Sequence, residues 1–566
     1  MLLLLLVPAF VLRPAPHHRC PACTCVLTDR PPTNDRFGDL PVPQSIAGAL
    51  ATANIYKPTP IQSASSMPIH RGGHTLLHSA TGSGKTLAYL LPLVARLHVS
   101  KPNQLLIVVP SRELALQTAA VVEQVWPHHG TRRAFVLAGT PSPADAAEQL
   151  RVAACPITIA TPRPLLALVR HLAGTDRLHS RRAIAVSGQG LATLASKLRA
   201  IVLDEADALL LDRELAIAGP PRRKSYQELS GGSGDIKAPE KFTKPTAKAV
   251  QALLKATGVG EAGGPAGFHG GGRAARGRGG RGGRGGRGGR GGRGGRGSSA
   301  KPAVQLVACS ATASYRLREE LCRLFEVRHE AKELAVLSAA DNDPNSSGKR
   351  TAGERGIGGV GVPPAITHWY VPCAHDGEKA RAVGTVLAQL QPRCALLFLE
   401  DDAPLKATVA ELTERGLDAV MLHEALGLGQ AANGAAPIPG GDGYRALRAA
   451  LRTTDAAEGV SSGGAEGAGG AEGGGCRLLV STASSARGLD LDTVDLVMLY
   501  ALPEAADQYL HLAGRTGRQG RGGAVVSLLD AQQVPQLGSI TRQLRISIKQ
   551  HAEIALRLAA AGESEM

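Results

Sequence analysis

Short runs of aliphatic residues recur along the chain, separated by longer stretches whose composition suits helices. In the first half, the runs that predict strands are HTLLHS, QLLIVVP, RAFVLAG, PITIATP, AIVLDEAD and VQLVACSAT. In the second half, they are ITHWYVP, CALLFLE, AVMLHE, RLLVSTAS, VDLVMLYALP and GGAVVSLLD. Nearly continuous apolar strands that alternate with helices indicate parallel sheets covered on both faces. The pattern therefore predicts an α/β protein with two such domains.

The runs also set the expected domain boundaries. We expect a leader at 1–34, a short region at 35–63, a first domain at 64–335, a linker at 336–364, a second domain at 365–552 and a tail at 553–566. Three low-complexity intervals interrupt the domains, at about 215–299, 425–443 and 459–475. Each falls between predicted elements, where a long insertion costs little because loop-closure entropy grows only logarithmically with length. We interpret all three as disordered surface insertions.

One of these insertions contains a ribbon of Arg-Gly repeats, Arg276 to Gly297. The net charge of the 566-residue chain is +16, and nine arginines lie between Arg273 and Arg296 without an acid, so the rest carries 16 − 9 = +7. An anionic polymer is the natural partner for such a segment. The alternative is a solvated coil without a partner. Hydrophobic residues make up 43% of the chain and aromatic residues only 3%, so the cores must be aliphatic.

The N-terminal leader and the cysteines give weaker signals. The first apolar run is too short to span a bilayer, and arginines without acids before Asp29 are typical of an organellar transit peptide. A chloroplast or mitochondrial location is therefore favoured, a wrongly assigned start codon is the alternative, and the nucleus, nucleolus or cytoplasm stay open. No other segment is long enough to cross a membrane. Nine irregularly spaced cysteines argue against a disulfide scaffold, and Cys20, Cys23 and Cys25 lack a second pair for zinc.

The segment HSATGSGKT follows a predicted strand and opens a predicted helix. Backbone N–H groups in such a loop can cradle phosphates, with Lys85 reaching the β- and γ-phosphates and Thr86 holding Mg²⁺. The general pattern has glycine where this chain has Ser79. A fortuitous Gly/Ser turn is the alternative.

Two further segments carry charges that suit phosphate chemistry. In IVLDEADALL, a strand ends in paired carboxylates; we assign Asp204 to the metal and Glu205 to the attacking water. The alternative is an acidic helix cap. In HLAGRTGR, Arg515 and Arg518 lie three apart and would point the same way on one helical turn, toward a γ-phosphate bound by the other domain. The alternative there is a solvated basic turn.

Together with YKPTPIQ, PSRELA, SAT and STASSARGLD, these segments resemble the motifs of the DEAD-box RNA helicases, in the family's order. The resemblance covers about Phe37 to Asp530 without the insertions. It implies two tandem RecA-like domains, RNA-stimulated ATP hydrolysis coupled to local duplex unwinding, and ATP and Mg²⁺ as cofactors. It also implies single-stranded or short duplex RNA as partner, RNP or ribosome-assembly proteins as further partners, and one chain as sufficient for catalysis.

The resemblance assigns roles to individual residues. ATP-binding residues are Phe37, which stacks on the base, Thr59, Gln62, which binds adenine, Ser79, Ala80, Thr81, Gly82, Ser83, Gly84, Lys85, Thr86, Gly488 and Asp490. RNA-binding residues are Pro110, Arg112, Gly139, Thr161, Arg163 and Thr482. Coupling residues are Asp207, Ser310 and Thr312, and the catalytic set is Lys85, Asp204, Glu205, Arg515 and Arg518.

The chain departs from the family at several positions. The family's glycine and arginine in TPGR are Arg163 and Pro164 here, its aspartate after Thr482 is Ala483, and Leu512 replaces an arginine. The QxxR motif has no clean counterpart, and Arg445 is our assignment. The losses concentrate on RNA gripping and interdomain coupling, whereas the ATP-binding residues are intact.

The departures leave alternatives open. An ATP-gated RNA clamp or assembly factor with little unwinding is the first. A DNA translocase on the same scaffold is the second, and the literal DEAD and SAT motifs argue against it. The Arg-Gly ribbon lies between these two motifs, inside the first domain, and glycine at two of every three positions cannot form a core. We expect the ribbon to be a sequence-tolerant RNA tether.

Overall fold

The computed structural model describes residues 36–79, 82–126, 132–139, 142–174, 184–211, 244–257, 304–311, 313–325, 334–338, 365–428, 444, 446, 447, 449, 451, 477–485, 488, 491, 493–517 and 521–563. The expected leader, most of the expected linker and the Arg-Gly ribbon lie outside these residues. The cysteine cluster at Cys20 to Cys25, Arg445 and nearly all of the two glycine-rich insertions of the second domain also lie outside them.

The first domain is built on a seven-stranded parallel sheet with the order β5-β6-β4-β7-β8-β3-β9. Its strands are β3 (His74–His78), β4 (Leu105–Val108), β5 (Ala134–Leu137), β6 (Ile157–Ala160), β7 (Ala200–Leu203), β8 (Gln305–Ser310) and β9 (Leu334–Ser338). A two-stranded antiparallel hairpin, β1 (Arg36–Phe37) and β2 (Leu40–Pro41), precedes the sheet. Every strand pair in the sheet is parallel, so all carboxyl ends lie at one edge.

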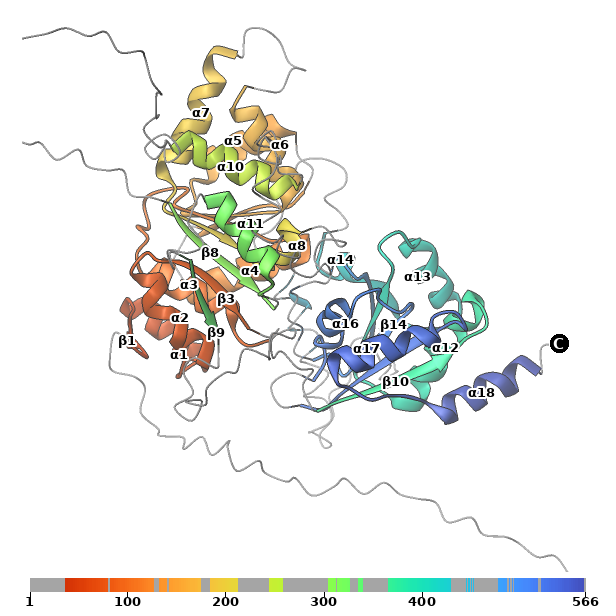
Figure 1. Cartoon of the computed structure of the whole chain (residues 1–566). Coiled ribbons are helices and arrows are strands. Elements are labelled where there is room, and N and C mark those ends of the chain that lie inside the picture. The colour runs from red at the N-terminus through yellow and green to blue at the C-terminus, as the bar shows by residue number, and fades with distance from the viewer. Residues whose placement is uncertain are drawn as a thin grey trace, which may run out of the picture.

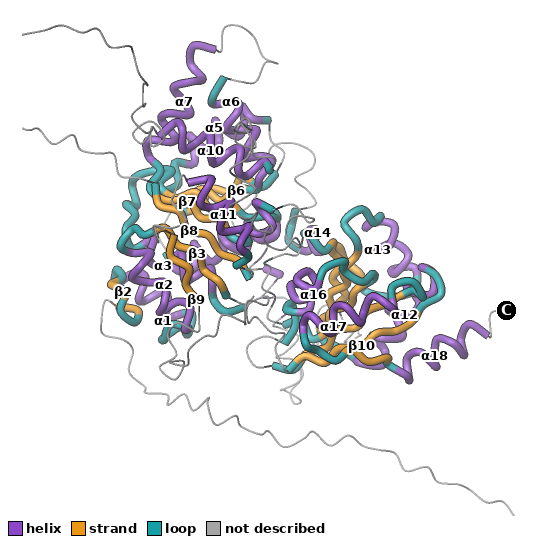
Figure 2. Tube along the Cα trace, in the orientation of Figure 1, coloured by secondary structure: helices purple, strands orange, loops and turns teal. Residues whose placement is uncertain are grey.

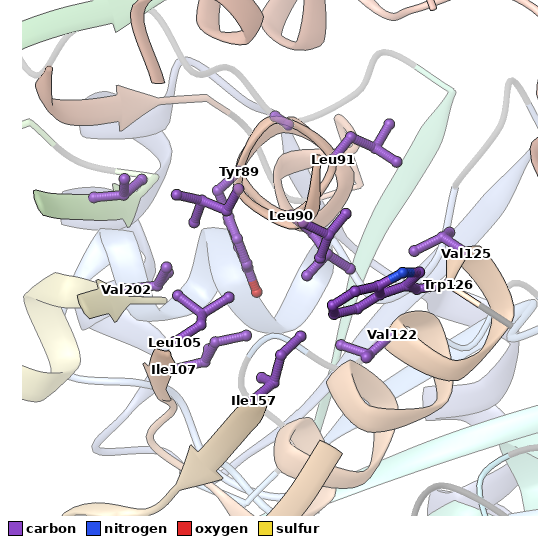
Figure 3. Close-up of a cluster of buried hydrophobic side chains, with 14 of the residues drawn as sticks. Tyr89, Leu90, Leu91, Leu105, Ile107, Val122, Val125, Trp126, Ile157 and Val202 are labelled. Atoms are coloured by element: carbon purple, nitrogen blue, oxygen red, sulfur yellow. The ribbon is translucent and has the colours of Figure 1, made fainter. Parts of the chain in front are cut away.

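Helices cover both faces of this sheet, as the separate purple layers in Figure 2 show. They are α1 (Gln44–Thr52), α2 (Pro60–His70), α3 (Lys85–Val94), α4 (Arg112–Val125), α5 (Pro143–Ala153), α6 (Pro162–Leu172), α7 (Ile184–Lys197), α8 (Ala206–Leu210), α10 (Pro245–Thr257) and α11 (Tyr315–Phe325). Alternate residues of β4 face opposite layers: Leu105 and Ile107 join the cluster under α3 and α4 (Figure 3), whereas Leu106 and Val108 join the cluster under α6 and α10. This two-sided burial explains why the strand reads as a continuous apolar run.

The second domain repeats the plan with the sheet order β12-β13-β11-β14-β15-β10-β16, again all parallel. Its strands are β10 (Ile366–Pro372), β11 (Cys394–Leu399), β12 (Ala419–Met421), β13 (Arg477–Thr482), β14 (Leu496–Leu499), β15 (Gly523–Leu529) and β16 (Ile548–Gln550). Its helices are α12 (Asp376–Leu390), α13 (Leu405–Glu414), α14 (Leu422–Ala425), α16 (Ala506–Ala513), α17 (Leu537–Leu544) and α18 (Ala552–Glu563), with a 3₁₀ turn at Val534–Gln536. In Figure 1 this domain is the teal-to-blue part of the chain.

The predicted strands are all present, which confirms two α/β domains with parallel sheets. The boundaries need corrections. Helix α10 lies inside the interval that we interpreted as a disordered insertion, and it buries Val250 and Leu253 against the first domain. Strand β9 runs past the expected end of that domain at 335. The expected tail at 553–566 is mostly helix α18, which packs on α12 through Ile554 and Leu558.

Among the residues that the structure describes, no helix is both long and apolar enough to cross a membrane.

Candidate functional site

The phosphate loop lies between β3 and α3, as the sequence predicts. Lys85 is the first residue of α3 and only 7% exposed, and its Nζ donates to the backbone oxygen of Ser79 at 3.1 Å. Gly84 has φ +90, and a Cβ there would lie 2.5 Å from Gln62 Nε2, so both the backbone and the neighbour require glycine. Gly82 also has a positive φ, whereas Ala80 and Thr81 lie outside the described residues.

The predicted acidic pair faces this loop from the end of β7. Lys85 Nζ lies 3.8 Å from Glu205 Oε1, and both side chains are buried. Glu205 adopts the left-handed conformation, with φ 54 and ψ 55, which costs a non-glycine residue about 1 kcal/mol. Such backbone strain is typical of functional sites because the surrounding fold must hold it in place.

Asp204 is buried beside Glu205 and is held by two donors. The Tyr89 hydroxyl donates to Asp204 Oδ2 at 3.0 Å, and the Glu205 backbone N–H donates to Asp204 Oδ1 at 3.1 Å. Burial raises the pKa of Asp204 from its ordinary value of 3.8 to about 6, and the charge of Glu205 adds to the rise. The charge of Lys85 and the hydrogen bond from Tyr89 act in the opposite direction.

The oxygen atoms in this corner fit a magnesium ion. Tyr89, one turn along α3 from Lys85, interacts through its hydroxyl with the side chains of both Thr86 and Asp204. A hydroxyl and a carboxylate therefore meet beside one buried phenol, and Mg²⁺ prefers such oxygen ligands. Burial raises the pKa of Tyr89 well above its usual 10.0, so the phenol keeps its proton and acts as a donor. Sequence reasoning missed Tyr89.

Gln62 and Thr59, two of the residues expected to bind ATP, hydrogen-bond to the backbone of the phosphate loop. Gln62 Nε2 donates to the Gly84 backbone oxygen at 3.2 Å, and its Oε1 accepts from the Thr59 backbone N–H at 2.9 Å. Thr59 Oγ1 donates to the Ser83 backbone oxygen at 3.0 Å. The Gln62 amide has a second N–H, and its contact with adenine stays a prediction. Phe37 lies in the β1–β2 hairpin and is 6% exposed within the first core cluster, so its stacking on a base also stays a prediction.

The predicted coupling residues connect the acidic segment to both β8 and the second domain. Ser310 Oγ, at the end of β8, donates to Asp207 Oδ1 at 2.8 Å. On its other side, Asp207 Oδ2 lies 3.9 Å from Nε2 of His511, a residue of α16 in the second domain. Ligand atoms of Glu205, Asp207 and His511 all lie within 4.8 Å of one another. His511 opens the HLAGRTGR segment, but sequence reasoning assigned it no role.

Arg515 is 2% exposed, and its Nε donates to the His511 backbone oxygen at 2.8 Å. This bond places Arg515 beside the residue that contacts Asp207. Arg518 and Thr312 lie outside the described residues, so their roles stay predictions.

The residues expected to bind RNA in the first domain follow three adjacent strands. Pro110 and Arg112 follow β4, Gly139 follows β5, and Thr161 and Arg163 follow β6. These strands form one half of the sheet, and the nucleotide motifs follow β7, β8 and β3 in the other half. Because all strands are parallel, the two halves present their loops at the same edge.

Of the second-domain residues, Thr482 is the last residue of β13, and Gly488 lies between β13 and β14. Thr482 Oγ1 donates to Ser485 Oγ at 3.0 Å. Gly488 has φ +74, and a Cβ there would collide with Leu114 of α4, while Gln117 Nε2 donates to the Gly488 backbone oxygen at 3.4 Å. A glycine at this position therefore permits close contact between the domains. Asp490 lies outside the described residues.

The interdomain boundary is partly apolar. One buried cluster contains Leu116 and Ala120 of α4 together with Leu512 and other residues of the second domain. Leu512, which replaces an arginine of the family, is thus 4% exposed within an apolar cluster. Hydrophobic burial takes the place of a charged link at this position.

The fold and the site together define the class of protein. The first parallel sheet carries a phosphate loop and an acidic pair at the end of a strand, and the second sheet has the same strand order. This is the arrangement of a P-loop protein with tandem RecA-like domains. The family model "DEAD/DEAH box helicase" matches residues 59–218, and "Helicase conserved C-terminal domain" matches residues 470–520. These two parts of the chain therefore carry the two domains of the DEAD/DEAH box helicases.

Among curated relatives, the chain is 34% identical over 179 residues to ATP-dependent RNA helicase DBP4 of Cryptococcus neoformans, covering 31% of this chain and 18% of the relative. It is 32% identical over 202 residues to ATP-dependent rRNA helicase RRP3 of Vanderwaltozyma polyspora, covering 34% of this chain and 36% of the relative. The alignments thus span well under half of these relatives.

Solved structures support the fold. Mss116p bound to ssRNA and AMP-PNP has a TM-score of 0.56 and 16% identity, covering 91% of this chain and 78% of that one. Dbp5 of S. cerevisiae bound to RNA and ADP BeF3 has a TM-score of 0.52 and 17% identity, covering 92% and 97%. These similarities confirm the arrangement of two RecA-like domains.

Proposed function

We propose that this protein is an ATP-dependent RNA helicase that couples ATP hydrolysis to RNA binding and to local duplex unwinding or RNP remodelling. The observation that carries the proposal is that Glu205, which pairs with Lys85, clusters with Asp207 and with His511 of the other domain, because this cluster joins the phosphate loop of one domain to the other domain. Relatives named as RNA helicases and the RNA-bound, nucleotide-bound neighbours support the same function.

In the proposed mechanism the loop from Ser79 to Thr86 binds the phosphates of ATP, and Lys85 neutralises charge on the terminal groups. Mg²⁺, held by Thr86 and Asp204, would supply further positive charge for the phosphates. Glu205 orients the attacking water and accepts its proton. The ion pair of Glu205 with Lys85 places the carboxylate beside the loop that binds the phosphates.

Coupling then follows from the contacts of Asp207. Ser310 and His511 both approach this carboxylate, so a change at the γ-phosphate can be transmitted to β8 and to α16. Arg515 would stabilise charge on the transferred phosphoryl group when the domains are closed. Closure would also bring the Thr482 edge toward the loops after β4, β5 and β6, where one RNA strand binds through its backbone with little sequence preference.

Replacement of Glu205 by Gln tests this mechanism. Glu205→Gln retains the shape of the side chain but removes the proton acceptor, so ATP hydrolysis should fall at least roughly a hundredfold. ATP and RNA binding should persist, measured by fluorescence titration on the same samples. Glu148→Gln, an exposed carboxylate of α5 that pairs with Arg151, is the matched control and should hydrolyse ATP normally. Normal turnover by Glu205→Gln would overturn the assignment.

A second candidate function is an ATP-gated RNA clamp with little strand separation. Leu512 in an apolar interdomain cluster and Pro164 in the first turn of α6 favour it, because both replace residues that bind RNA or couple the domains in the family. RNA-stimulated ATP hydrolysis measured beside separation of a short duplex distinguishes the two functions. Hydrolysis without strand release identifies the clamp.

A further inference from the structure

The edge of the second domain that would meet RNA carries an acidic loop. Strands β11 and β13 are neighbours, with Leu399 in register with Thr482, and the Ala483 backbone N–H donates to the Leu399 oxygen at 3.1 Å. The loop that follows β11 is therefore adjacent to the segment that follows β13. It begins with three successive exposed acids, Glu400, Asp401 and Asp402.

The segment after β13 presents the donors that a phosphate requires. Thr482, Ser484 and Ser485 provide three neighbouring hydroxyls: Thr482 Oγ1 lies 3.0 Å from Ser485 Oγ and 3.4 Å from Ser484 Oγ. The Ser484 backbone N–H is a further donor at the same place. Hydroxyls and backbone N–H groups at a strand end are the usual donors to nucleic-acid phosphates.

An anion of the protein itself already binds to these donors. Asp401 Oδ1 accepts from the Ser484 backbone N–H at 2.9 Å. An ionised carboxylate, like a phosphate, carries only acceptor oxygens. The two anions therefore cannot hydrogen-bond to each other, and they repel each other when both approach one donor.

We propose that Asp401 is an internal substitute for an RNA phosphate at the end of β13, and that RNA must displace its carboxylate to engage the second domain. Asp401 thereby lowers the affinity of this domain for RNA. The inference rests on the proposed RNA-binding function and adds a residue that sets the strength of that binding.

A purely structural role of Asp401 and a role in competing with phosphate predict different effects of substitution. If the bond to Ser484 serves only to hold the loop, Asp401→Asn keeps an acceptor oxygen in place and leaves RNA affinity unchanged. If the carboxylate competes with a phosphate, the same substitution tightens RNA binding by about threefold to thirtyfold, the range for one unit charge at a partly solvated site. The gain should shrink as salt screens the repulsion. Asp401→Glu retains the charge and should give no gain.

The experiment uses the full chain with a short single-stranded RNA that carries a fluorophore, in the presence of Mg²⁺ and a non-hydrolysable ATP analogue. Binding is followed by fluorescence anisotropy for wild type, Asp401→Asn, Asp401→Glu and Asp402→Asn. Asp402→Asn removes one charge from the same loop and should tighten binding distinctly less than Asp401→Asn. Binding of the ATP analogue, titrated separately, should be equal in all four proteins.

The outcomes separate the inference from the function on which it rests. If wild type binds RNA and Asp401→Asn binds with equal or lower affinity, the inference is wrong and the proposed function stands. If the two Asn variants gain equally, general charge rather than the contact with Ser484 is responsible, and the inference is also wrong. If none of the four proteins binds RNA, both the inference and the proposed function fail.

Discussion

The carboxylate of Asp204 is ionised at neutral pH in surroundings that oppose its charge, and this makes its removal a sharp test. Asp204 is 4% exposed, and burial together with the charge of Glu205 raises its pKa from 3.8 to about 6. We predict that Asp204→Asn stabilises the first domain in the absence of nucleotide and metal, although it should abolish ATP hydrolysis. A buried charged residue that destabilises the free protein is typical of a binding site, because a bound ligand of opposite charge offsets its charge.

The raised pKa of Asp204 determines whether its contribution to stability rises or falls with pH. Because the pKa is higher in the folded state, the folded protein binds more protons than the unfolded protein between about pH 4 and pH 6. The contribution of Asp204 to the free energy of unfolding therefore falls as pH rises through this window, and its full cost is present above it. The shift of about 2 pKa units, from 3.8 to about 6, corresponds to about 3 kcal/mol.

Asparagine has no such titration, so the stability of Asp204→Asn relative to wild type should increase by about 3 kcal/mol between about pH 4 and neutral pH. A constant offset from altered hydrogen bonds does not affect this increment. The new amide oxygen can still accept from Tyr89, whereas one acceptor for the Glu205 N–H is lost, which costs about 1 kcal/mol at every pH.

Urea unfolding in the presence of EDTA measures this increment. The chain has two tryptophans, Trp126 in the first domain and Trp369 in the second, so a Trp369→Phe background makes the fluorescence report on the first domain. Asp39→Asn, an exposed carboxylate of the β1–β2 turn, is the control. If the difference between Asp204→Asn and wild type is the same at both ends of the pH range, the buried charge is not destabilising and the reasoning fails.

Two further predictions concern the same site and the Arg-Gly ribbon. Tyr89→Phe removes the hydrogen bond that lowers the pKa of Asp204, so that pKa should rise further above 6. The acidic limb of the ATPase pH profile should then move to higher pH by as much as about one pH unit. An acidic limb at the same pH as in wild type would contradict this role of Tyr89. Deletion of residues 270–298 removes nine arginines, and should weaken RNA affinity and flatten its dependence on salt, as measured by anisotropy titrations; if neither changes, the ribbon is a passive spacer.

The sequence predicts the two sheets well because their strands are buried on both faces, which gives unbroken apolar runs. The elements that it misses lack this signature. Strand β9 is only partly buried at the edge of its sheet, and β16 is a three-residue edge strand with a polar sequence, IKQ. Helix α10 has an apolar stripe at helical spacing, but low-complexity sequence flanks it on both sides, and composition averaged over the interval conceals the stripe.

The candidate site is predictable where its residues follow strands of one parallel sheet. Lys85, Asp204 and Ser310 come from three strand ends, and the fold brings them to one edge as expected. Contacts that depend on side-chain direction are not predictable in this way. Tyr89 reads as an ordinary core residue of a helix, and only the tertiary structure shows that its hydroxyl reaches Asp204. The contact of Asp401 with Ser484 is likewise invisible, because 83 residues separate the two along the chain.

The order of strands in the first sheet also bears on how such a chain can change over generations. Loops after β7, β8 and β3 carry the motifs proposed to bind ATP and couple it to RNA, whereas loops after β5, β6 and β4 carry the residues expected to bind RNA, and the two groups occupy opposite halves of the sheet. Arg163 and Pro164, which stand where the family has glycine and arginine, can therefore coexist with an intact set of residues proposed to bind ATP. After gene duplication, one copy could acquire a different nucleic-acid specificity and still retain those residues.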